Sequence, residues 1–174
     1  QRQIERRDRQ ADAERQFGHI GRRRVGQQFV YGQHVGADFD TLRLARLDAW
    51  EWALEEAYRG RPTEPVFVAL ADTAARFAIP ITPFRRLLRA FRGDVDFRPF
   101  ATFEDLRGYC RDSADPVGHL ILYLFGHGDE ARQALSDRIC TGLQLANFWQ
   151  DVSVDAQKGR VYVPREDLDR FGVS

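Results

Sequence analysis

Lysine is almost absent from this chain of 174 residues: Lys158 is the single lysine, and every other one of the 26 basic residues is arginine. An excess of charge is also absent, because 26 acidic residues balance the basic ones. A neutral chain argues against a nucleic-acid binder that depends on a basic surface. Cysteine is scarce: Cys110 and Cys140 lie in apolar, helix-like segments without a CxxC or Cys/His pattern, so buried free thiols are expected.

Long apolar runs are missing as well. The chain contains no stretch of about 18 apolar residues and no signal-peptide pattern. This pattern predicts a cytoplasmic protein and leaves open a peripheral contact with the inner face of a membrane.

Leucine is missing from residues 1–36, which hold eight of the arginines and seven of the eleven glutamines. Such a composition buries little apolar surface, so weak or no order is expected there. The character of the sequence changes near residue 40, and residues 41–174 are expected to form the folded domain.

Apolar residues recur near helical spacing after residue 40. The pattern predicts helices over residues 41–58, 65–79, 83–95, 102–126 and 130–155. Pro116 is expected to kink the fourth of them. No segment alternates polar and apolar residues for long, and VYVP is too short to predict a strand. The sequence therefore predicts an all-α protein.

One apolar segment, QLANFWQDVSVD, carries polar side chains at spacings of three, four and four. On a helix, Gln144, Asn147, Asp151 and Asp155 fall within roughly 80° of one another. Carboxylates at i and i+4 suit Mg²⁺, and the two amides suit a second ion or a phosphate oxygen. The alternative is a solvated helix face, which explains most DxxxD patterns.

The residues that follow Asp155 favour an anionic ligand. Lys158, Arg160 and Tyr162 offer a point charge, a planar fork and a hydroxyl donor, which together suit a diphosphate. A metal and cations would stabilise a departing diphosphate as its negative charge develops. The neighbouring apolar side chains would line a pocket; they are Leu143, Leu145, Phe148 and Trp149.

These motifs resemble those of a known family. QLANFWQDVSVDAQKGRVYVP (144–164) resembles the second aspartate-rich motif of the squalene/phytoene synthase family. YCRDSADPVG (109–118) resembles the family's YCxxVAGxVG helix, and FRGDVDFRPFATFEDL (91–106), with Asp94, is a weaker match. NFWQDVSVD together with SADPVG is most similar to the hydroxysqualene synthase branch of hopanoid biosynthesis.

The resemblance implies an isoprenoid-synthase bundle of helices around a deep apolar cavity. It implies Mg²⁺-dependent chemistry on farnesyl diphosphate or presqualene diphosphate, giving hydroxysqualene or squalene precursors for hopanoids. The substrate is then an amphiphilic prenyl diphosphate, with other hopanoid-pathway enzymes as further partners.

Matched positions imply roles for individual residues. Tyr109 would lie at the reacting carbons, with a tyrosine packed in the core as the alternative. The other roles are Mg²⁺ ligands (Asp151, Asp155 and Asn147), diphosphate-binding residues (Gln144, Asn147, Lys158, Arg160 and Tyr162) and prenyl-cavity residues (Ser113, Ala114, Gly118 and Phe148). For Ala114 and Gly118, close helix packing is the alternative.

The N-terminal part departs from the family pattern. The family has a first aspartate-rich helix of DDxxD type, which the resemblance places near residues 22–32. The sequence there, GRRRVGQQFVYG, has no acidic residue. Asp8 and Asp12 form a DxxxD pattern, but they lie too far upstream.

Three further departures concern the motifs and the end of the chain. Gln150 stands where several relatives have arginine, and Ser113 and Pro116 replace a valine and a small residue. The chain ends at FGVS, whereas the family continues with more helices. We therefore expect residues 41–174 to be a partial domain from a fragment or a disturbed reading frame, with residues 1–36 as a frame artefact.

Three other functions stay open at this point. One is phytoene-type condensation of longer chains, and another is a catalytically dead fragment that keeps a diphosphate-binding fold. The third is a plain helical interaction module, for which replacement of Asp151 by asparagine would leave ligand binding unchanged.

Overall fold

Helices account for all the regular structure in the described part of the chain. The computed structural model describes the backbone of residues 34–173 and the side chains from Phe39 onward, and it contains no strand within that range. The all-α class is therefore confirmed. The elements are α2 (His34–Tyr58), α3 (Pro65–Arg76), α4 (Thr82–Val95), α5 (Phe103–Ser113), α6 (Asp115–Leu124), α7 (Glu130–Gln150), α8 (Val152–Gln157) and α9 (Arg165–Phe171).

Helix α2 begins earlier than the apolar pattern predicts. It starts at His34, inside the segment for which weak or no order was expected. The rest of that segment, residues 1–33, lies outside the described residues, and so do the DxxxD pattern of Asp8 and Asp12 and the position of the first aspartate-rich motif.

Local chemistry sets several helix ends. Gly60 follows α2 with a positive φ of 75°, which glycine adopts without strain. Prolines occupy the first turns of α3, α4 and α6, where no helical N–H bond is lost. Helix α5 has a capping box, in which the Asp105 N–H donates to Thr102 Oγ1 and the Thr102 N–H donates to Asp105 Oδ2.

The bend expected at Pro116 is a complete break between two helices. Helix α5 ends at Ser113, and Ala114 leaves helical geometry with φ −120° and ψ −51°. Asp115, the first residue of α6, is buried and accepts a hydrogen bond of 2.9 Å from Thr141 Oγ1 of α7. This bond ties the break to the neighbouring helix.

The single helix predicted over 130–155 is wrong at Asp151. Helix α7 ends at Gln150, Asp151 has φ −96° and ψ 7°, and the short α8 begins at Val152. The β-branched residues Val152 and Val154 favour a helix less than the segment before them, and the apolar period does not register this. Asp151 therefore stands between two helices. A further short helix, α9, was not predicted.

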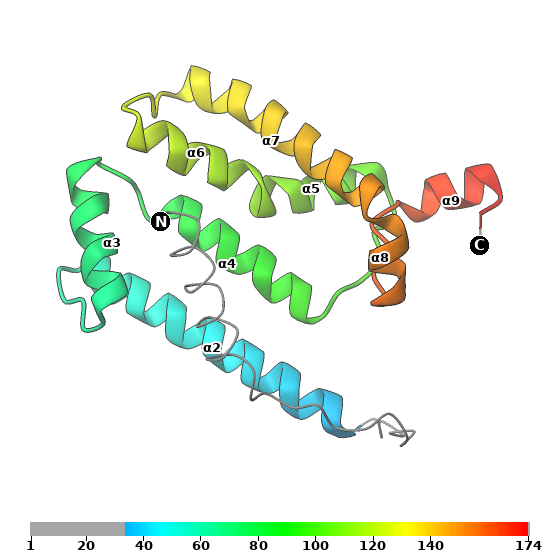
Figure 1. The fold of residues 1–174 in the computed structure, drawn as a ribbon, viewed down its shortest axis with the longest axis horizontal. Coiled ribbons are helices and arrows are strands. Elements are labelled where there is room, and N and C mark those ends of the chain that lie inside the picture. Colours follow the sequence, from blue (N-terminus) through cyan, green and yellow to red (C-terminus); the bar gives the residue numbers. More distant parts are fainter. Residues whose placement is uncertain (1–33, 174) are drawn as a thin grey trace, which may run out of the picture. The chain divides into compact units, whose positions relative to one another are not determined.

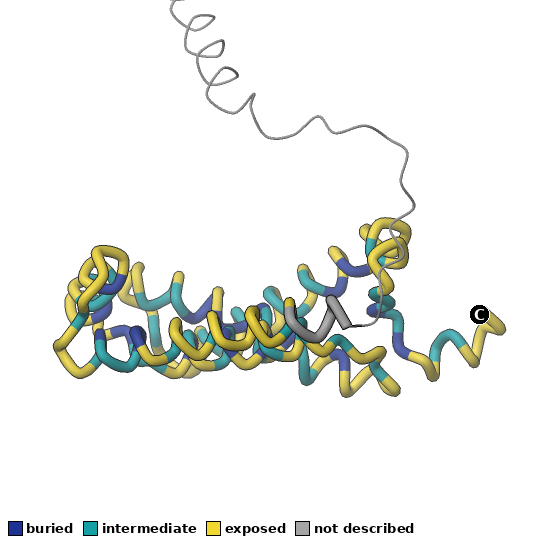
Figure 2. The backbone as a smooth tube through the Cα atoms, turned by 90° about the horizontal axis from the view of Figure 1, so that it is seen from below, coloured by how far each residue is buried: buried dark blue, intermediate teal, exposed yellow. Residues whose placement is uncertain are grey.

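The long helices lie side by side in one layer. Helix α4 contacts α2 on one side and α5 and α6 on the other, and α7 packs along α5 and α6 (Figure 1). Seen from below, these helices form a single row with many exposed positions (Figure 2). No helix among residues 34–173 is long and apolar enough to cross a membrane.

Two apolar clusters hold this layer together. The first joins α2, α3 and α4; its buried residues are Ala53, Leu54, Ala57, Phe67 and Leu88. The second joins α5, α7 and the segment after α8; its buried residues are Leu106, Cys110, Leu145, Phe148 and Tyr162. Both cysteines are free thiols as predicted, with Cys110 buried and Cys140 half-buried.

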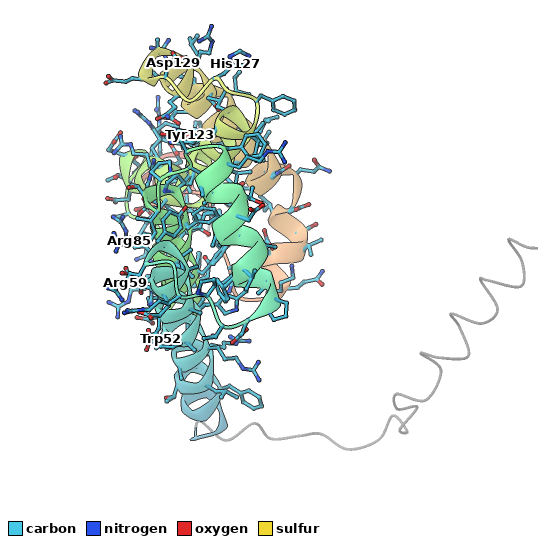
Figure 3. All side chains as sticks on the ribbon, turned by 90° about the vertical axis from the view of Figure 1, so that its left-hand side faces the viewer. Trp52, Arg59, Arg85, Tyr123, His127 and Asp129 are labelled. Atoms are coloured by element: carbon cyan, nitrogen blue, oxygen red, sulfur yellow. The ribbon has the colours of Figure 1, made fainter. Side chains whose placement is uncertain are left out.

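An ion-pair network fixes the end of α2 to α4. Glu55 accepts hydrogen bonds from Arg59 at 3.1 Å and from Arg85 Nε at 3.0 Å. Figure 3 shows Arg59 and Arg85 on the same side of these helices. The pKa of Glu55 is lowered, chiefly by the hydrogen bond from Arg85, so the carboxylate stays charged at neutral pH.

Candidate functional site

An aromatic cluster forms where α5, α7 and the segment after α8 meet. The rings of Phe148 and Tyr162 are stacked, with centroids 4.0 Å apart and planes 4° apart. Tyr109 of α5 lies 6.1 Å from Phe148 and 6.2 Å from Tyr162. Phe97 and Phe100, from the segment between α4 and α5, complete the cluster. Aromatic faces surrounding one tyrosine provide a π surface that attracts cations.

The hydroxyl of Tyr109 is held in one direction. It donates a hydrogen bond of 2.7 Å to Asp94 Oδ1 at the end of α4. Burial, followed by this hydrogen bond and the charge of Asp94, raises the pKa of Tyr109 well above its usual range. Tyr109 is therefore a neutral donor at physiological pH.

Arg160 reaches the same residue from the other side of the cluster. One Nη atom donates to the backbone oxygen of Asp94 at 2.9 Å, and the other lies 3.4 Å from Tyr162 Oη. The guanidinium carbon is 5.7 Å from the centre of the Phe97 ring. A guanidinium has five N–H donors in all, so Arg160 keeps donors for a ligand while its position is fixed.

The predicted metal ligands Asp151 and Asp155 lie a few residues before Arg160 in the chain. The side chain of Asp151 is exposed, and Asp155 Oδ1 lies 3.2 Å from Lys158 Nζ. The Asp155 N–H donates to the backbone oxygen of Asp151, so the two residues share one turn. Lys158 is thus already paired with a carboxylate rather than free for phosphate.

The donor set is chemically suited to Mg²⁺, because carboxylate and amide oxygens are hard ligands. Asp151, Asp155 and Asn147 supply such oxygens. Within residues 34–173, however, no group of three or more His, Cys, Asp or Glu side chains gathers around one point. The described part of the chain therefore offers a partial set of ligands, and the metal role of these residues stays a prediction.

An apolar wall adjoins the polar end of α7. We give this name to Val117 and Ile121 of α6 and Ile139 and Leu143 of α7, which are 46–63% exposed. Leu143 precedes Asn147 by four residues, so the two lie within about 40° of each other around the helix axis. A hydrocarbon chain on this wall would have its polar end at Asn147. Gln144, on the same helix, is half-buried.

The predicted cavity residues have different surroundings. The hydroxyl of Ser113 is buried and has no hydrogen-bond partner among the described residues. Ala114 is buried at the break between α5 and α6. A Cβ atom on Gly118 would lie 2.2 Å from Ser136 Oγ and 2.6 Å from Cys140 Sγ, so this glycine permits the close approach of α6 to α7. That is the packing role considered as the alternative, and the cavity role stays a prediction.

The structure thus brings Tyr109, Phe148, Arg160 and Tyr162 together. It adds residues that the sequence analysis did not assign to the site: Asp94, Phe97, Phe100, and three members of the apolar wall, Val117, Ile121 and Ile139. Asp94 stood in the weakest of the three motif matches, and the segment DFRPF (96–100) was the only local signal for the two phenylalanines.

Comparisons with known proteins identify the family of the chain. The sequence profile of the squalene/phytoene synthase family matches residues 32–174, and the chain belongs to this family. The phytoene synthase of Mycobacterium tuberculosis is 37% identical over 131 residues, which cover 75% of this chain and 43% of that protein. The 15-cis-phytoene synthase of Synechococcus elongatus is 37% identical, covering 80% of this chain and 49% of that protein.

Solved structures show the same relationship. The squalene synthase HpnC from Alicyclobacillus acidocaldarius superposes with a TM-score of 0.73 at 50% identity, covering 75% of this chain and 50% of that one. A dehydrosqualene synthase solved in complex with a ligand gives 0.66 at 34% identity, covering 75% and 46%. The fold is therefore that of the isoprenoid synthases, and the chain spans about half the length of the relatives it matches.

Proposed function

We propose that this chain acts in a Mg²⁺-dependent prenyl-diphosphate enzyme that converts farnesyl diphosphate or presqualene diphosphate to hydroxysqualene. The observation that carries the proposal is the junction of Tyr109 and Arg160 at Asp94, beside the polar end of α7 and its apolar wall. This arrangement offers, one after another in space, a cationic hydrogen-bond donor, a neutral hydroxyl and an apolar surface. These features match a diphosphate, the reacting carbons and a prenyl tail, respectively. The 50% identity to HpnC favours the squalene-forming branch over phytoene-type condensation.

The diphosphate would lie between the end of α7 and Arg160. Arg160 binds phosphate oxygens with the N–H groups that Asp94 and Tyr162 leave free. Asn147 donates its amide N–H to a phosphate oxygen or offers its carbonyl to the metal, and Gln144 supports it. Asp151 and Asp155 would hold Mg²⁺, which neutralises the negative charge that develops on a leaving diphosphate.

Tyr109 would face the carbon end of the substrate. Its hydroxyl stays protonated, so its dipole and the faces of the surrounding rings are the polar features offered to a carbocation. Asp94 fixes the orientation of this hydroxyl, and the apolar wall of α6 and α7 would contact the hydrocarbon chain.

The test supplies the full chain with farnesyl diphosphate and Mg²⁺, and it measures release of inorganic diphosphate together with the extracted products by mass spectrometry. Hydroxysqualene is the expected product. Asp151→Asn should abolish release, whereas Asp169→Asn, the same change on exposed α9, should leave it intact. Product from geranylgeranyl diphosphate alone would reassign the chain to the phytoene branch. The absence of any Mg²⁺-dependent binding of diphosphate would overturn the proposal.

One observation favours a second candidate, a fold that binds diphosphate without ionising it. The described residues supply only a partial set of metal ligands, and Lys158 is paired with Asp155. A metal site with ligands from one aspartate-rich motif stabilises a leaving group less than a site with ligands from two. Mg²⁺-dependent binding of inorganic pyrophosphate without release from farnesyl diphosphate would identify this case.

A further inference from the structure

Arginine side chains line a cavity on the side of α5 that faces away from Tyr109. Its volume is about 580 Å³, and its cationic residues are Arg86 of α4, Arg107 and Arg111 of α5, and Arg138 of α7. Arg107 and Tyr109 are two positions apart on α5, so roughly 160° separates them around the helix axis. The cavity is therefore distinct from the diphosphate site proposed above.

A buried polar network forms the floor of this cavity. Asp115 is 2% exposed, accepts the hydrogen bond from Thr141, and lies 3.9 Å from Arg86. Arg86 also donates to Asp112 Oδ1 at 3.3 Å and to the backbone oxygen of Arg111. These bonds tie α4, α5, α6 and α7 together at one point, so the floor is rigid.

The second carboxylate that lines the cavity is also already paired. Asp137 Oδ1 lies 2.6 Å from His119 Nε2, across the contact between α6 and α7. Asp115 and Asp137 each have a partner within the protein, and the cavity lining holds four arginines against these two carboxylates. The residues that line the cavity therefore carry more positive than negative charges.

Three arginines, Arg107, Arg111 and Arg138, lie at the open side of the cavity and present planar guanidinium groups. Glu104 lies 3.1 Å from Arg107 and 2.5 Å from Arg111, which orients two guanidinium groups one helical turn apart. Arg138 faces them from α7 and has no ion-pair partner among the described residues. Phe103 and Leu145 give the rim an apolar part. Forks of this kind suit the tetrahedral oxygens of a phosphate group.

We propose that this cavity binds the phosphate group of an organic phosphate ester, held by Arg107, Arg111 and Arg138 above the Arg86–Asp115 floor. Its volume falls within the usual range for small-molecule sites. The apolar rim fits the carbon part of the ester. A soluble metabolite and a phospholipid headgroup share this chemistry, and the experiment separates them.

The experiment titrates the full chain by calorimetry in buffer free of divalent cations, so that the metal-dependent site does not contribute. The probes are glycerol phosphate and vesicles of phosphatidylglycerol in phosphatidylcholine, with pure phosphatidylcholine as the reference. The cavity variant is Arg107→Gln with Arg138→Gln. The matched control is Arg98→Gln with Arg132→Gln, two exposed arginines that do not line the cavity.

The unchanged chain is expected to bind at least one phosphate probe, and the cavity variant about tenfold more weakly or worse, since it lacks two charge-assisted donors. The control variant should bind like the unchanged chain. Saturable binding of glycerol phosphate assigns a soluble ligand, and binding to anionic vesicles alone assigns a lipid headgroup.

Three results would overturn the proposal: no binding of either probe, binding unaffected in the cavity variant, or an equal loss in the control. Arg138→Gln alone guards against misfolding, because Arg138 makes no ion pair within the described residues that its removal would break. This single variant should retain the helical circular dichroism of the unchanged chain and still weaken binding.

Discussion

The ring of Tyr162 lies parallel to the ring of Phe148, with 4.0 Å between their centroids. This stack attaches the segment after α8 to helix α7, and with it the position of Arg160. Arg160, the arginine proposed to bind diphosphate, lies between α8 and α9 and is positioned by this aromatic packing, by the backbone oxygen of Asp94, and by its own N–H, which donates to the backbone oxygen of Asp155.

Removing the Tyr162 ring should therefore cause a large loss in the free energy of unfolding. Tyr162 is 8% exposed, so Tyr162→Ala removes a buried ring and is expected to lower the free energy of unfolding by about 3–5 kcal/mol. Tyr162→Phe keeps the stack and loses only the 3.4 Å contact with Arg160, at a cost of about 1 kcal/mol or less. Urea denaturation of both variants measures the difference. Equal losses would show that the hydroxyl, not the ring, holds this segment.

Gly118 should tolerate a methyl group poorly. A Cβ there would meet Ser136 Oγ and Cys140 Sγ inside the α6–α7 contact, so Gly118→Ala is expected to destabilise by about 1–3 kcal/mol. Gly108 is the matched control within α5, because a Cβ there meets nothing within 4 Å. Gly108→Ala should stabilise by about 0.5–1 kcal/mol through its helix propensity. Thermal unfolding of the two variants should shift in opposite directions, and a shared direction would contradict the packing role.

Part of this architecture was predictable from local sequence. Pro116 predicted a kink within one helix over residues 102–126, and the structure has a full break at Ala114, with Pro116 in the first turn of α6. Thr102, with acidic residues in the first turn, correctly marked the start of α5. The break at Asp151 was not predictable in the same way. The apolar period runs without interruption through residues 144–155, and periodicity reports which face is buried, not where the backbone leaves the helix.

The junction at Asp94 was beyond local reasoning altogether. Asp94, Tyr109 and Arg160 come from three separate segments, and no spacing rule places them within hydrogen-bond reach. Motif resemblance indicated Tyr109 and Arg160 individually. Only the packing of α4 against α5, and of Tyr162 against Phe148, shows that Asp94 accepts hydrogen bonds from both Tyr109 and Arg160.

The decline in the free energy of unfolding above about pH 10 should report on Tyr58. Its hydroxyl donates to the backbone oxygen of Ile79 at 3.0 Å, and burial raises the pKa of Tyr58 to about 12. An unfolded tyrosine titrates near pH 10, so between about pH 10 and pH 12 the unfolded state has lost this proton while the folded state keeps it. The stability contributed by Tyr58 is therefore present below about pH 10 and is lost as the pH rises toward 12.

The measurement is the free energy of unfolding against pH for the unchanged chain and Tyr58→Phe. The variant should be less stable by about 1 kcal/mol at neutral pH, because it loses the hydrogen bond to Ile79. Its decline above pH 10 should also be shallower. Tyr109, whose pKa is also raised by burial, continues to contribute in both proteins. Parallel declines would refute the assignment to Tyr58.

Arg160→Lys separates the geometry of the proposed diphosphate site from its charge. Lysine keeps the positive charge but cannot reach Asp94 and Tyr162 together while presenting a fork to phosphate. We expect the affinity for inorganic pyrophosphate in the presence of Mg²⁺ to fall about tenfold, the equivalent of roughly 1.4 kcal/mol. Arg165→Lys, the same change on the exposed first residue of α9, is the matched control and should bind normally. Calorimetric titration of both variants decides the point: an unchanged affinity in Arg160→Lys would mean that Arg160 acts only as a charge, and an equal fall in both would remove it from the site.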